Sequence, residues 1–219
     1  MAKQSVVVIG LGRFGTSVAQ TLTERGHEVL GVDADMKTVE KATDLVTQAV
    51  QADASDEETL VELGVRNFDI GVVAISSDVK SSILITLLLK RLGLGTVIAK
   101  AQDELHGEIL SKVGADRVVY PNRDTGVRVA HSISAKDVID YMEMARGYAV
   151  AKFLVPPDLA GKELGSLQLK EKYGINVLIL LRRQSQEMMV NPSKYERLAA
   201  GDTLLISGRD EDIDRWRSA

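Results

Sequence analysis

The stretch that decides the fold of the first half of this chain is Val6-Val7-Val8-Ile9-Gly10-Leu11-Gly12-Arg13-Phe14-Gly15. Its apolar β-branched residues predict a buried strand, and its glycines have the GxGxxG spacing of a loop that binds nucleotide phosphate. Gly10 permits a tight turn, Gly12 lets a phosphate approach the backbone, and Gly15 lets the next helix lie close to the sheet. The free amides at the start of that helix favour an anion there.

From this stretch to residue 120, apolar runs alternate with helical patterns. The runs contain Val and Ile continuously, which is typical of parallel strands covered on both faces. The predicted strands are Val6–Ile9, Glu28–Val32, Val46–Val50, Ile70–Ile75, Thr96–Lys100 and Arg117–Tyr120, and the predicted helices are Phe14–Arg25, Met36–Thr43, Ser55–Leu63, Val79–Leu92 and Glu104–Val113. This order indicates an α/β fold, a Rossmann-like doubly wound parallel sheet over residues 1–122. The expected helix caps are Asp35, Ser55, Asp78 and Asp103.

The pattern changes after Pro121. Residues 123–147 are expected to link the domains and contact a second copy, with Arg123–Met144 in one or two crossover helices. Residues 148–219 are expected to form a second, smaller α+β domain. Its predicted strands are Tyr148–Val155, Val177–Arg182, Met188–Val190 and Asp202–Ser207, and its predicted helices are Ser166–Lys172 and Asp210–Arg217. This domain has a thin core and the helix Val79–Leu92 has little polar surface, so we expect both to contact another subunit.

The composition excludes several classes of protein. The chain has 219 residues, with 27 Lys and Arg against 31 Asp and Glu, and one Trp, five Tyr and three Phe. A nucleic-acid binder would show a basic face and more stacking rings. Cys is absent, which excludes disulfides and thiolate zinc sites and fits a reducing cytosol. The longest uncharged apolar run, Ser81–Leu89, is shorter than a bilayer span of ~20 residues, and Met1–Gln4 leaves no room for a signal peptide before the first strand.

Asp33 and Arg13 add chemistry to the glycine loop. Asp33 ends the second predicted strand, where it is placed to accept hydrogen bonds from ribose hydroxyls. An acid here disfavours a 2′-phosphate and therefore NADP. Arg13 would oppose the helix dipole by ~0.3–1 kcal/mol unless an anion offsets it, so we expect its guanidinium to contact phosphate. The alternatives are an empty Rossmann-like site and an Arg13 that is only solvated.

Three further segments follow strands and are expected at the same crevice. They are Ala52-Asp53-Ala54, Ser76-Ser77-Asp78, and the pair Lys100 and Gln102. Asp53 either contacts the base of the nucleotide or only starts a helix. The serine hydroxyls either contact the ligand or only cap a helix. Lys100 binds phosphate or is only a charge at a strand end.

No pattern indicates a metal site or catalytic machinery. His27, His106 and His131 have no partner at metal or general-base spacing, so each is expected to be structural or solvated. The HExxH, GxSxG, GKS and EF-hand patterns do not occur. An NAD-dependent dehydrogenase, the first rival interpretation, needs an acid or base in its substrate domain, and residues 148–219 contain no histidine. We therefore expect a chain that is not an enzyme.

Longer motifs extend these patterns: Val8–Gly15, Gly26–Asp33, Gly64–Asp69, Leu87–Lys90, Val97–Gln102, Val113–Val119, and Leu164, Leu167, Lys170, Tyr173-Gly174 and Val177. Through them essentially the whole chain resembles the cytosolic regulatory subunits of bacterial potassium uptake systems of the Ktr/Trk type, which are built from RCK domains. The resemblance is closest to the Ktr-like group.

The resemblance implies that adenine nucleotide, ATP or ADP, binds in the Rossmann crevice. The residues expected to contact it are Gly10, Leu11, Gly12, Arg13, Phe14, Gly15, Asp33, Ala34, Asp53, Ala54, Ile75, Ser76, Lys100 and Asn122. In Ktr-like members the loop arginine reaches toward a nucleotide phosphate in the neighbouring subunit. Trk-like members usually lack it and favour NAD, so Arg13 favours ATP/ADP. The alternative is an RCK-type redox sensor of NAD or NADH.

Two positions depart from the family pattern. Ktr-like proteins commonly have Glu where this chain has Asn122, so it stays open whether a divalent or monovalent cation takes part in nucleotide binding. Some relatives bind cyclic di-AMP across the interface between C-terminal domains, which in this family are ligand-binding modules. The family often has Arg at the position of Lys170, and because lysine lacks a planar fork, cyclic di-AMP also stays open here.

The resemblance further implies an assembly. Homodimers would form an octameric ring in the cytoplasm, docked on the inner face of the cell membrane beneath a potassium-translocating membrane subunit. ATP and ADP would favour different ring shapes and so gate transport by population shift. Nucleic acid is not an expected partner.

Overall fold

The computed structural model describes residues 3–75, 77–134 and 137–217. The chain divides into two compact units, residues 1–122 and 123–219. Each unit has buried apolar clusters of its own. Within the described ranges, no helix is both long enough and apolar enough to cross a bilayer.

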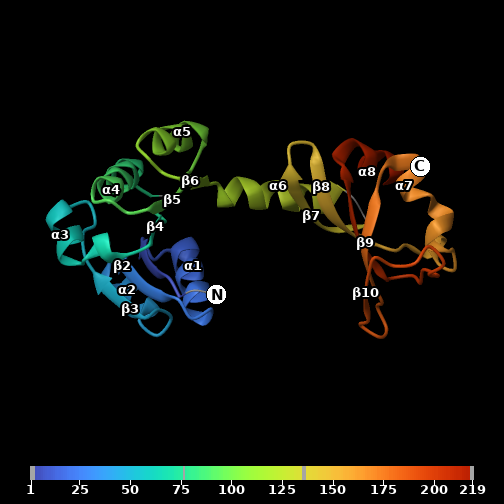
Figure 1. Cartoon of the computed structure of the whole chain (residues 1–219), viewed down its shortest axis with the longest axis horizontal. Coiled ribbons are helices and arrows are strands. Elements are labelled where there is room, and N and C mark those ends of the chain that lie inside the picture. Colours follow the sequence, from blue (N-terminus) through green and yellow to red (C-terminus); the bar gives the residue numbers. More distant parts are fainter. Residues whose placement is uncertain (1–2, 76, 135–136, 218–219) are drawn as a thin grey trace. The chain divides into compact units, whose positions relative to one another are not determined.

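The N-terminal unit contains a six-stranded sheet in the order β3-β2-β1-β4-β5-β6, in which neighbouring strands are parallel (Figure 1). The predicted doubly wound fold is therefore confirmed. The strands are β1 (Ser5–Ile9), β2 (Glu28–Asp33), β3 (Gln48–Gln51), β4 (Ile70–Val73), β5 (Thr96–Lys100) and β6 (Arg117–Val119). Because β1 pairs with both β2 and β4, the chain order reverses beside β1, and this switch point is where open parallel sheets bind ligands.

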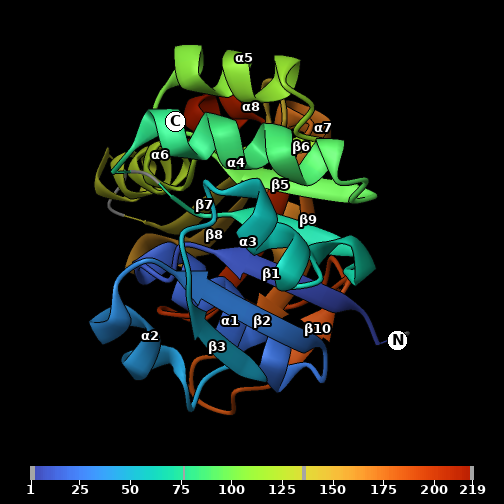
Figure 2. The ribbon, with the colours of Figure 1, turned by 90° about the vertical axis from the view of Figure 1, so that its left-hand side faces the viewer.

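Helices cover both faces of this sheet (Figure 2). Apolar side chains of α1 (Arg13–Glu24) and α2 (Met36–Ala42) pack with Val6 and Val8 of β1. Those of α3 (Glu57–Glu62), α4 (Val79–Arg91) and α5 (Glu104–Lys112) pack with Val7 and Ile9. The continuous apolar run of β1 is therefore explained, because successive side chains of a strand point to opposite faces and both faces are covered.

Aspartates cap the helices that follow the strands. The predicted caps are confirmed at Asp35, Asp78 and Asp103, each of which accepts a hydrogen bond from a backbone amide in the first turn. The third helix is different, because Asp56 caps it by accepting from the amide of Thr59, so the predicted cap Ser55 is wrong. Ser55 instead donates its amide and hydroxyl to Asp53, which forms the turn before the helix.

The helix α4 has one buried and one exposed apolar side. Its buried residues are Ser82, Ile85, Thr86, Leu88 and Leu89, whereas Leu84 is 41% and Leu87 42% exposed. Residues three apart share one side of a helix, so the two exposed leucines form a small apolar strip. A second subunit over this strip stays a prediction.

The C-terminal unit is built on a five-stranded antiparallel sheet in the order β10-β9-β11-β8-β7 (Figure 1). Its strands are β7 (Val138–Ala145), β8 (Tyr148–Leu154), β9 (Asn176–Leu181), β10 (Met188–Val190) and β11 (Thr203–Arg209). The helix α6 (Pro121–Ser134) leads into it, and α7 (Leu169–Tyr173) and α8 (Asp210–Arg217) follow. Trp216 of α8 packs against Phe153 of β8 with ring centroids 4.4 Å apart. Short 3-10 turns occur at Val65–Asn67 (η1), Pro157–Leu159 (η2) and Leu164–Leu167 (η3).

The predicted helix Ser166–Lys172 is divided into a 3-10 turn and the short helix α7, and the last part of the predicted crossover helix is wrong. Residues 138–144 were expected in a crossover helix, but they form β7, which pairs with β8 across the turn Arg146-Gly147. The ladder is irregular between Val138 and Asp140, so Val138 and Tyr141, three residues apart, are both buried. A bulge thus gives this strand the spacing of a helix. Only pairing with β8 distinguishes the two.

Candidate functional site

A cavity of about 310 Å³ lies at the switch point of the parallel sheet. It is bounded by the carboxyl ends of β1, β2, β3 and β4, by the glycine loop and by the first two turns of α4. The lining residues are Ile9, Gly10, Gly12, Val32, Asp33, Ala34, Ala52, Asp53, Ala54, Ala74, Ile75, Ser77, Asp78, Ser81 and Ile85. Several segments expected at one crevice therefore meet here.

The three glycines of the loop have different surroundings. Gly10 has φ of +92°, a conformation that favours glycine, and a Cβ on it would lie 2.9 Å from Cγ1 of Ile75. A Cβ on Gly15 would collide with the carbonyl oxygen of Gly10, whereas no atom lies within 4 Å of the Cβ position of Gly12. The tight turn and the close helix–sheet approach are confirmed. The space at Gly12 is open to a ligand.

Asp33 ties the glycine loop to the end of β2. One oxygen of its carboxylate accepts from the amide of Leu11 at 2.7 Å, and the other accepts from the amide of Asp35 at 2.9 Å. A carboxylate has about four acceptor positions, so the half-buried Asp33 keeps capacity for hydroxyl groups in the cavity. Leu11 is itself buried beneath the loop.

Two more aspartates of the cavity are engaged locally. Asp53 accepts from the hydroxyl of Ser55 at 2.6 Å, and Asp78 accepts from the hydroxyl of Ser81 at 2.7 Å. These side-chain hydrogen bonds, followed by bonds from the same serines' amides, lower the pKa of both Asp53 and Asp78. Asp53 forms the turn before α3, Asp78 caps α4, and both line the cavity, so contact of these segments with a ligand stays a prediction.

The electrostatics of the cavity are one-sided. Its described lining includes three carboxylates and no Lys or Arg. Such a lining suits the neutral, hydroxyl-bearing part of a nucleotide, its base and ribose, better than its phosphates. The open space at Gly12 and the amides at the start of α1 lie at the edge of this cavity, where a phosphate meets a favourable dipole.

Several predicted site residues lie outside the cavity lining. Arg13 is exposed on the first turn of α1, and Asn122 is exposed on the first turn of α6. The ammonium of Lys100 lies over the ring of Phe14, 5.5 Å from its centroid. Gln102 also does not line the cavity, and Ser76 lies outside the described residues.

The structure adds lining residues that the sequence patterns did not single out. Ser81 and Ile85 come from α4, at three and seven residues after the cap Asp78. Their spacing places them on the helix face that looks toward the strand ends. A helical projection from Asp78 would have found them.

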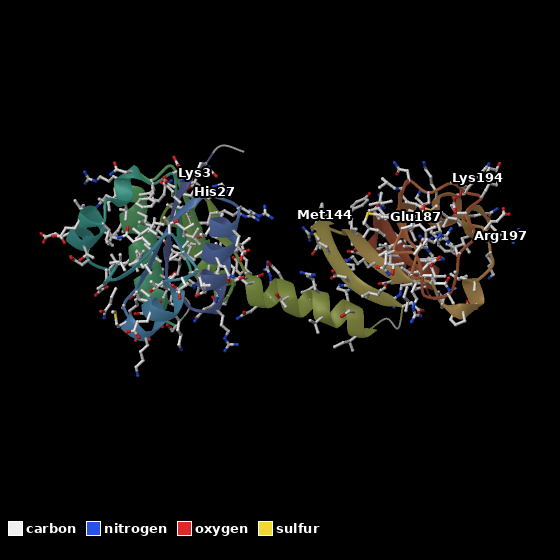
Figure 3. All side chains as sticks on the ribbon, turned by 90° about the horizontal axis from the view of Figure 1, so that it is seen from below. Lys3, His27, Met144, Glu187, Lys194 and Arg197 are labelled. Carbon is white, nitrogen blue, oxygen red and sulfur yellow. The ribbon has the colours of Figure 1, made fainter. Side chains whose placement is uncertain are left out.

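The three histidines lie away from the cavity lining. Figure 3 shows His27 beside Lys3, and the ring of His27 accepts from the amide of Gln4 at the start of β1, at the opposite edge of the sheet. His131 stacks on Tyr141 of β7 with ring centroids 3.7 Å apart. His106 is buried, and burial lowers its pKa although Asp103 opposes the shift. The described residues hold no group of three or more acidic or histidine side chains suited to a metal ion.

A second cavity, of about 470 Å³, lies in the C-terminal unit. Lys170 and Glu171 of α7 line it together with Asn176 of β9. Asn191 and Lys194 lie on its other side, after β10. Its mixed polar lining differs from the acidic lining of the first cavity.

Comparison with protein families accounts for both units. A model of the TrkA-N domain matches residues 6–121, and a model of the TrkA-C domain matches residues 150–218. The chain is 40% identical over 214 residues to Ktr system potassium uptake protein C of Bacillus subtilis (strain 168), covering 98% of this chain and 96% of that protein. It is 37% identical over 206 residues to Ktr system potassium uptake protein A of Vibrio alginolyticus, covering 94% and 93%.

Solved structures show the same fold. The crystal structure of the GsuK RCK domain superposes with a TM-score of 0.69 at 17% identity over 99% of this chain. The chain spans about half, 47%, of that longer protein. The GsuK channel bound to NAD superposes with a TM-score of 0.54 at 24% identity, and this chain covers 38% of it. With its TrkA-N and TrkA-C domains and its near-full-length similarity to the Ktr proteins, the chain belongs to the Ktr/Trk family of RCK-domain potassium uptake proteins.

Proposed function

We propose that this chain is the regulatory subunit of a potassium uptake system and that adenine nucleotide in the N-terminal cavity controls it. The observation that carries the proposal is Asp33 beside the glycine loop, in a chain that matches Ktr proteins over nearly its whole length. The ribose of ATP or ADP would donate its hydroxyls to Asp33, and its base would lie among the alanines and Ile75. The phosphates would extend out of the cavity over Gly12.

The proposed mechanism is a population shift between conformations of an assembled ring. A ligand moves such an equilibrium only by binding one state more tightly than the other. Arg13 is exposed and lies outside its own chain's cavity lining, which supports contact with a phosphate held by a neighbouring copy. The octameric ring, its place at the cytoplasmic face of the membrane and its potassium-translocating partner are part of this proposal.

The proposal includes no catalytic step. The acids Asp53 and Asp78 already accept hydrogen bonds from Ser55 and Ser81, which makes them poor bases for activating water. Incubation of the purified chain with ATP is therefore expected to yield no ADP above the uncatalysed rate.

Calorimetric titration of the purified chain with ATP, ADP, NAD and NADH tests the ligand. We expect ATP and ADP to bind at micromolar affinity or better. Arg13→Ala is expected to narrow the ratio of ATP to ADP affinity, since charge-assisted hydrogen bonds to phosphate are worth ~1.5–3 kcal/mol each. The second candidate, a redox sensor, is favoured by the NAD-bound GsuK channel with the same fold, and clearly tighter NADH binding would establish it.

Asn122 has no negative charge, and this bears on whether a cation takes part in nucleotide binding. Its neutral side chain cannot attract a divalent cation as a glutamate would, so Mg²⁺ or Ca²⁺ is expected to change ATP affinity little. Asn122→Glu should increase this dependence. A tenfold gain with cation in the unchanged protein, about 1.4 kcal/mol, would show that other carboxylates hold the ion.

The second cavity is the proposed place for a second ligand. Lys170, Lys194 and the side-chain amides of Asn176 and Asn191 suit an anionic dinucleotide such as cyclic di-AMP. Titration with cyclic di-AMP, compared between the unchanged chain and Lys170→Ala, tests this part of the proposal without involving the N-terminal cavity.

A further inference from the structure

A groove between α1 and α2 lies directly beside the N-terminal cavity. Its volume is about 500 Å³. Gly12 lines both this groove and the cavity, and the Cβ position of Gly12 has no atom within 4 Å. A ligand group that leaves the cavity over Gly12 therefore enters this groove without crossing any side chain of residue 12.

The groove is lined by hydrogen-bond donors. Arg13 and Lys41 bring two cations to it, from α1 and α2 respectively, and the described lining includes no Asp or Glu. The hydroxyls of Thr16 and Thr38 already donate to the carbonyl of Leu11 and to Asp35. In the described part of the chain, Arg13, Lys41 and Ser17 have no side-chain hydrogen bond or ion pair, so these three groups are available to a ligand.

The charge of the groove is opposite to that of the cavity beside it. The cavity contributes three carboxylates and the groove two cations, in a chain whose net charge is −4. The helix α1 also has neither a side-chain cap nor an acidic residue in its first turn, so its amino end adds positive potential. An anion is therefore favoured in the groove and disfavoured in the cavity.

We propose that the groove between α1 and α2 binds a phosphate group through Lys41 and Ser17, with Arg13 at its rim. The phosphate has two sources: the terminal phosphate of a bound nucleotide, which rests on the proposed function, or free phosphate. In both cases Lys41 supplies a point charge and Ser17 a neutral donor. Lys41 thereby becomes a residue that distinguishes nucleotides by the number of their phosphates.

Titration of the full chain with inorganic pyrophosphate, at constant ionic strength, tests the groove. Lys41→Gln should weaken binding about five- to tenfold, the size of one charge-assisted hydrogen bond at a partly exposed site, and Ser17→Ala about twofold. Lys37→Gln is the matched control, because Lys37 is an exposed lysine of the same helix outside the groove lining. The proposal is wrong if pyrophosphate does not bind, if Lys41→Gln binds it unchanged, or if Lys37→Gln loses as much.

Competition with nucleotide distinguishes the two sources. If the phosphate belongs to a nucleotide, saturation with ADP abolishes pyrophosphate binding, and Lys41→Gln narrows the ratio of ADP to AMP affinity. If the source is free phosphate, both ligands bind together and that ratio is unchanged. Adenosine has no phosphate and needs only the cavity. A chain that binds pyrophosphate but no adenosine, ADP or NAD would overturn the proposed function while the groove stands.

Discussion

Asp33 in the N-terminal unit and Asp202 in the C-terminal unit are both aspartates at strand ends, yet their surroundings differ. Asp33 is half-buried and accepts from two backbone amides. The side chain of Asp202 is 3% exposed and is paired with Arg182 at 2.8 Å. It also accepts from the amides of Arg183 and Ala199.

The consequence is a difference in what each carboxylate can still bind. Burial by itself raises the pKa of Asp202, but the hydrogen bonds from Arg182 and two amides outweigh it and hold the pKa below its usual value. Arg182 also reaches Glu196 at 2.7 Å, so this network is satisfied internally. The N-terminal unit keeps acceptors free at a cavity, whereas the C-terminal unit uses them to hold its own loops.

The largest expected effect is on the stability of the C-terminal unit. Asp202→Ala leaves Arg182 without its most buried partner, so we expect the free energy of unfolding to fall by about 3–5 kcal/mol. Trp216 is the only tryptophan of the sequence and packs against this unit's core, so its fluorescence during denaturation reports the change. Asp158→Ala, at an exposed position of the same unit, is the control. An equal loss in both variants would contradict the role given to the network.

The next effect is a difference in stability between substitutions at two glycines of the loop, Gly15 and Gly12. In Gly15→Ala the new Cβ collides with the carbonyl oxygen of Gly10, so we expect a loss of about 1–3 kcal/mol in unfolding free energy, typical of overpacking. Gly12→Ala should cost less, about 0.5–1 kcal/mol, because its Cβ meets no atom within 4 Å and only the preference for Gly over Ala at this N-cap position is lost. It should also weaken the binding of ADP. Circular dichroism during denaturation, with parallel titrations, checks both. Equal destabilisation would show that the loop is not as rigid as the contacts indicate.

A smaller effect concerns the ribose. Asp33→Ala should weaken the binding of adenosine, ADP, ATP and NAD by the same factor, because each ligand presents the same ribose hydroxyls. The loss of one charge-assisted hydrogen bond corresponds to about a tenfold loss of affinity. The ratio of ATP to ADP affinity should stay nearly constant, in contrast to Arg13→Ala. Calorimetry on both variants makes the comparison. A ratio that changes with Asp33 would place the phosphates, rather than the ribose, beside it.

The smallest effect is a pH dependence within the N-terminal unit. Burial lowers the pKa of His106 in the folded chain, whereas the unfolded value is near 6.5. The unfolded chain therefore binds the proton first, so stability is complete above about pH 6.5 and falls as the pH decreases further. His106→Gln should flatten this dependence in denaturation curves measured from pH 7.5 to 5. His27→Gln should leave it in place, and the opposite result would assign the effect to His27.

The sequence predicted the N-terminal unit well because its signals are local. The run Val6–Ile9 is apolar and β-branched and ends at Gly10, which favours a strand, and the glycine spacing and the cap Asp78 each act within a few residues. The C-terminal unit was harder. Val138 and Tyr141 have a helical spacing, and only the irregular ladder with β8 makes them a strand.

The candidate site was predicted in part for the same reason. Asp33, Asp53 and Ile75 follow strands, and parallel strands bring their carboxyl ends to one edge, so these residues met at the cavity as expected. Lys100 and Asn122 also follow strands but lie outside its lining. Position at the end of a strand predicts the end of the sheet where a residue lies, whereas its distance from the switch point depends on the strand order, which places β5 and β6 beyond β4.

By itself the sequence determined the parallel sheet, the glycine loop and most of the helix caps, because each depends on residues that are close together in the chain. Only the tertiary structure decided that β7 is a strand, that Asp202 is enclosed by Arg182, and that Lys41 of α2 faces the same groove as Arg13 of α1. These features join residues on different elements. Their energies come from packing and charge pairing that no local pattern contains.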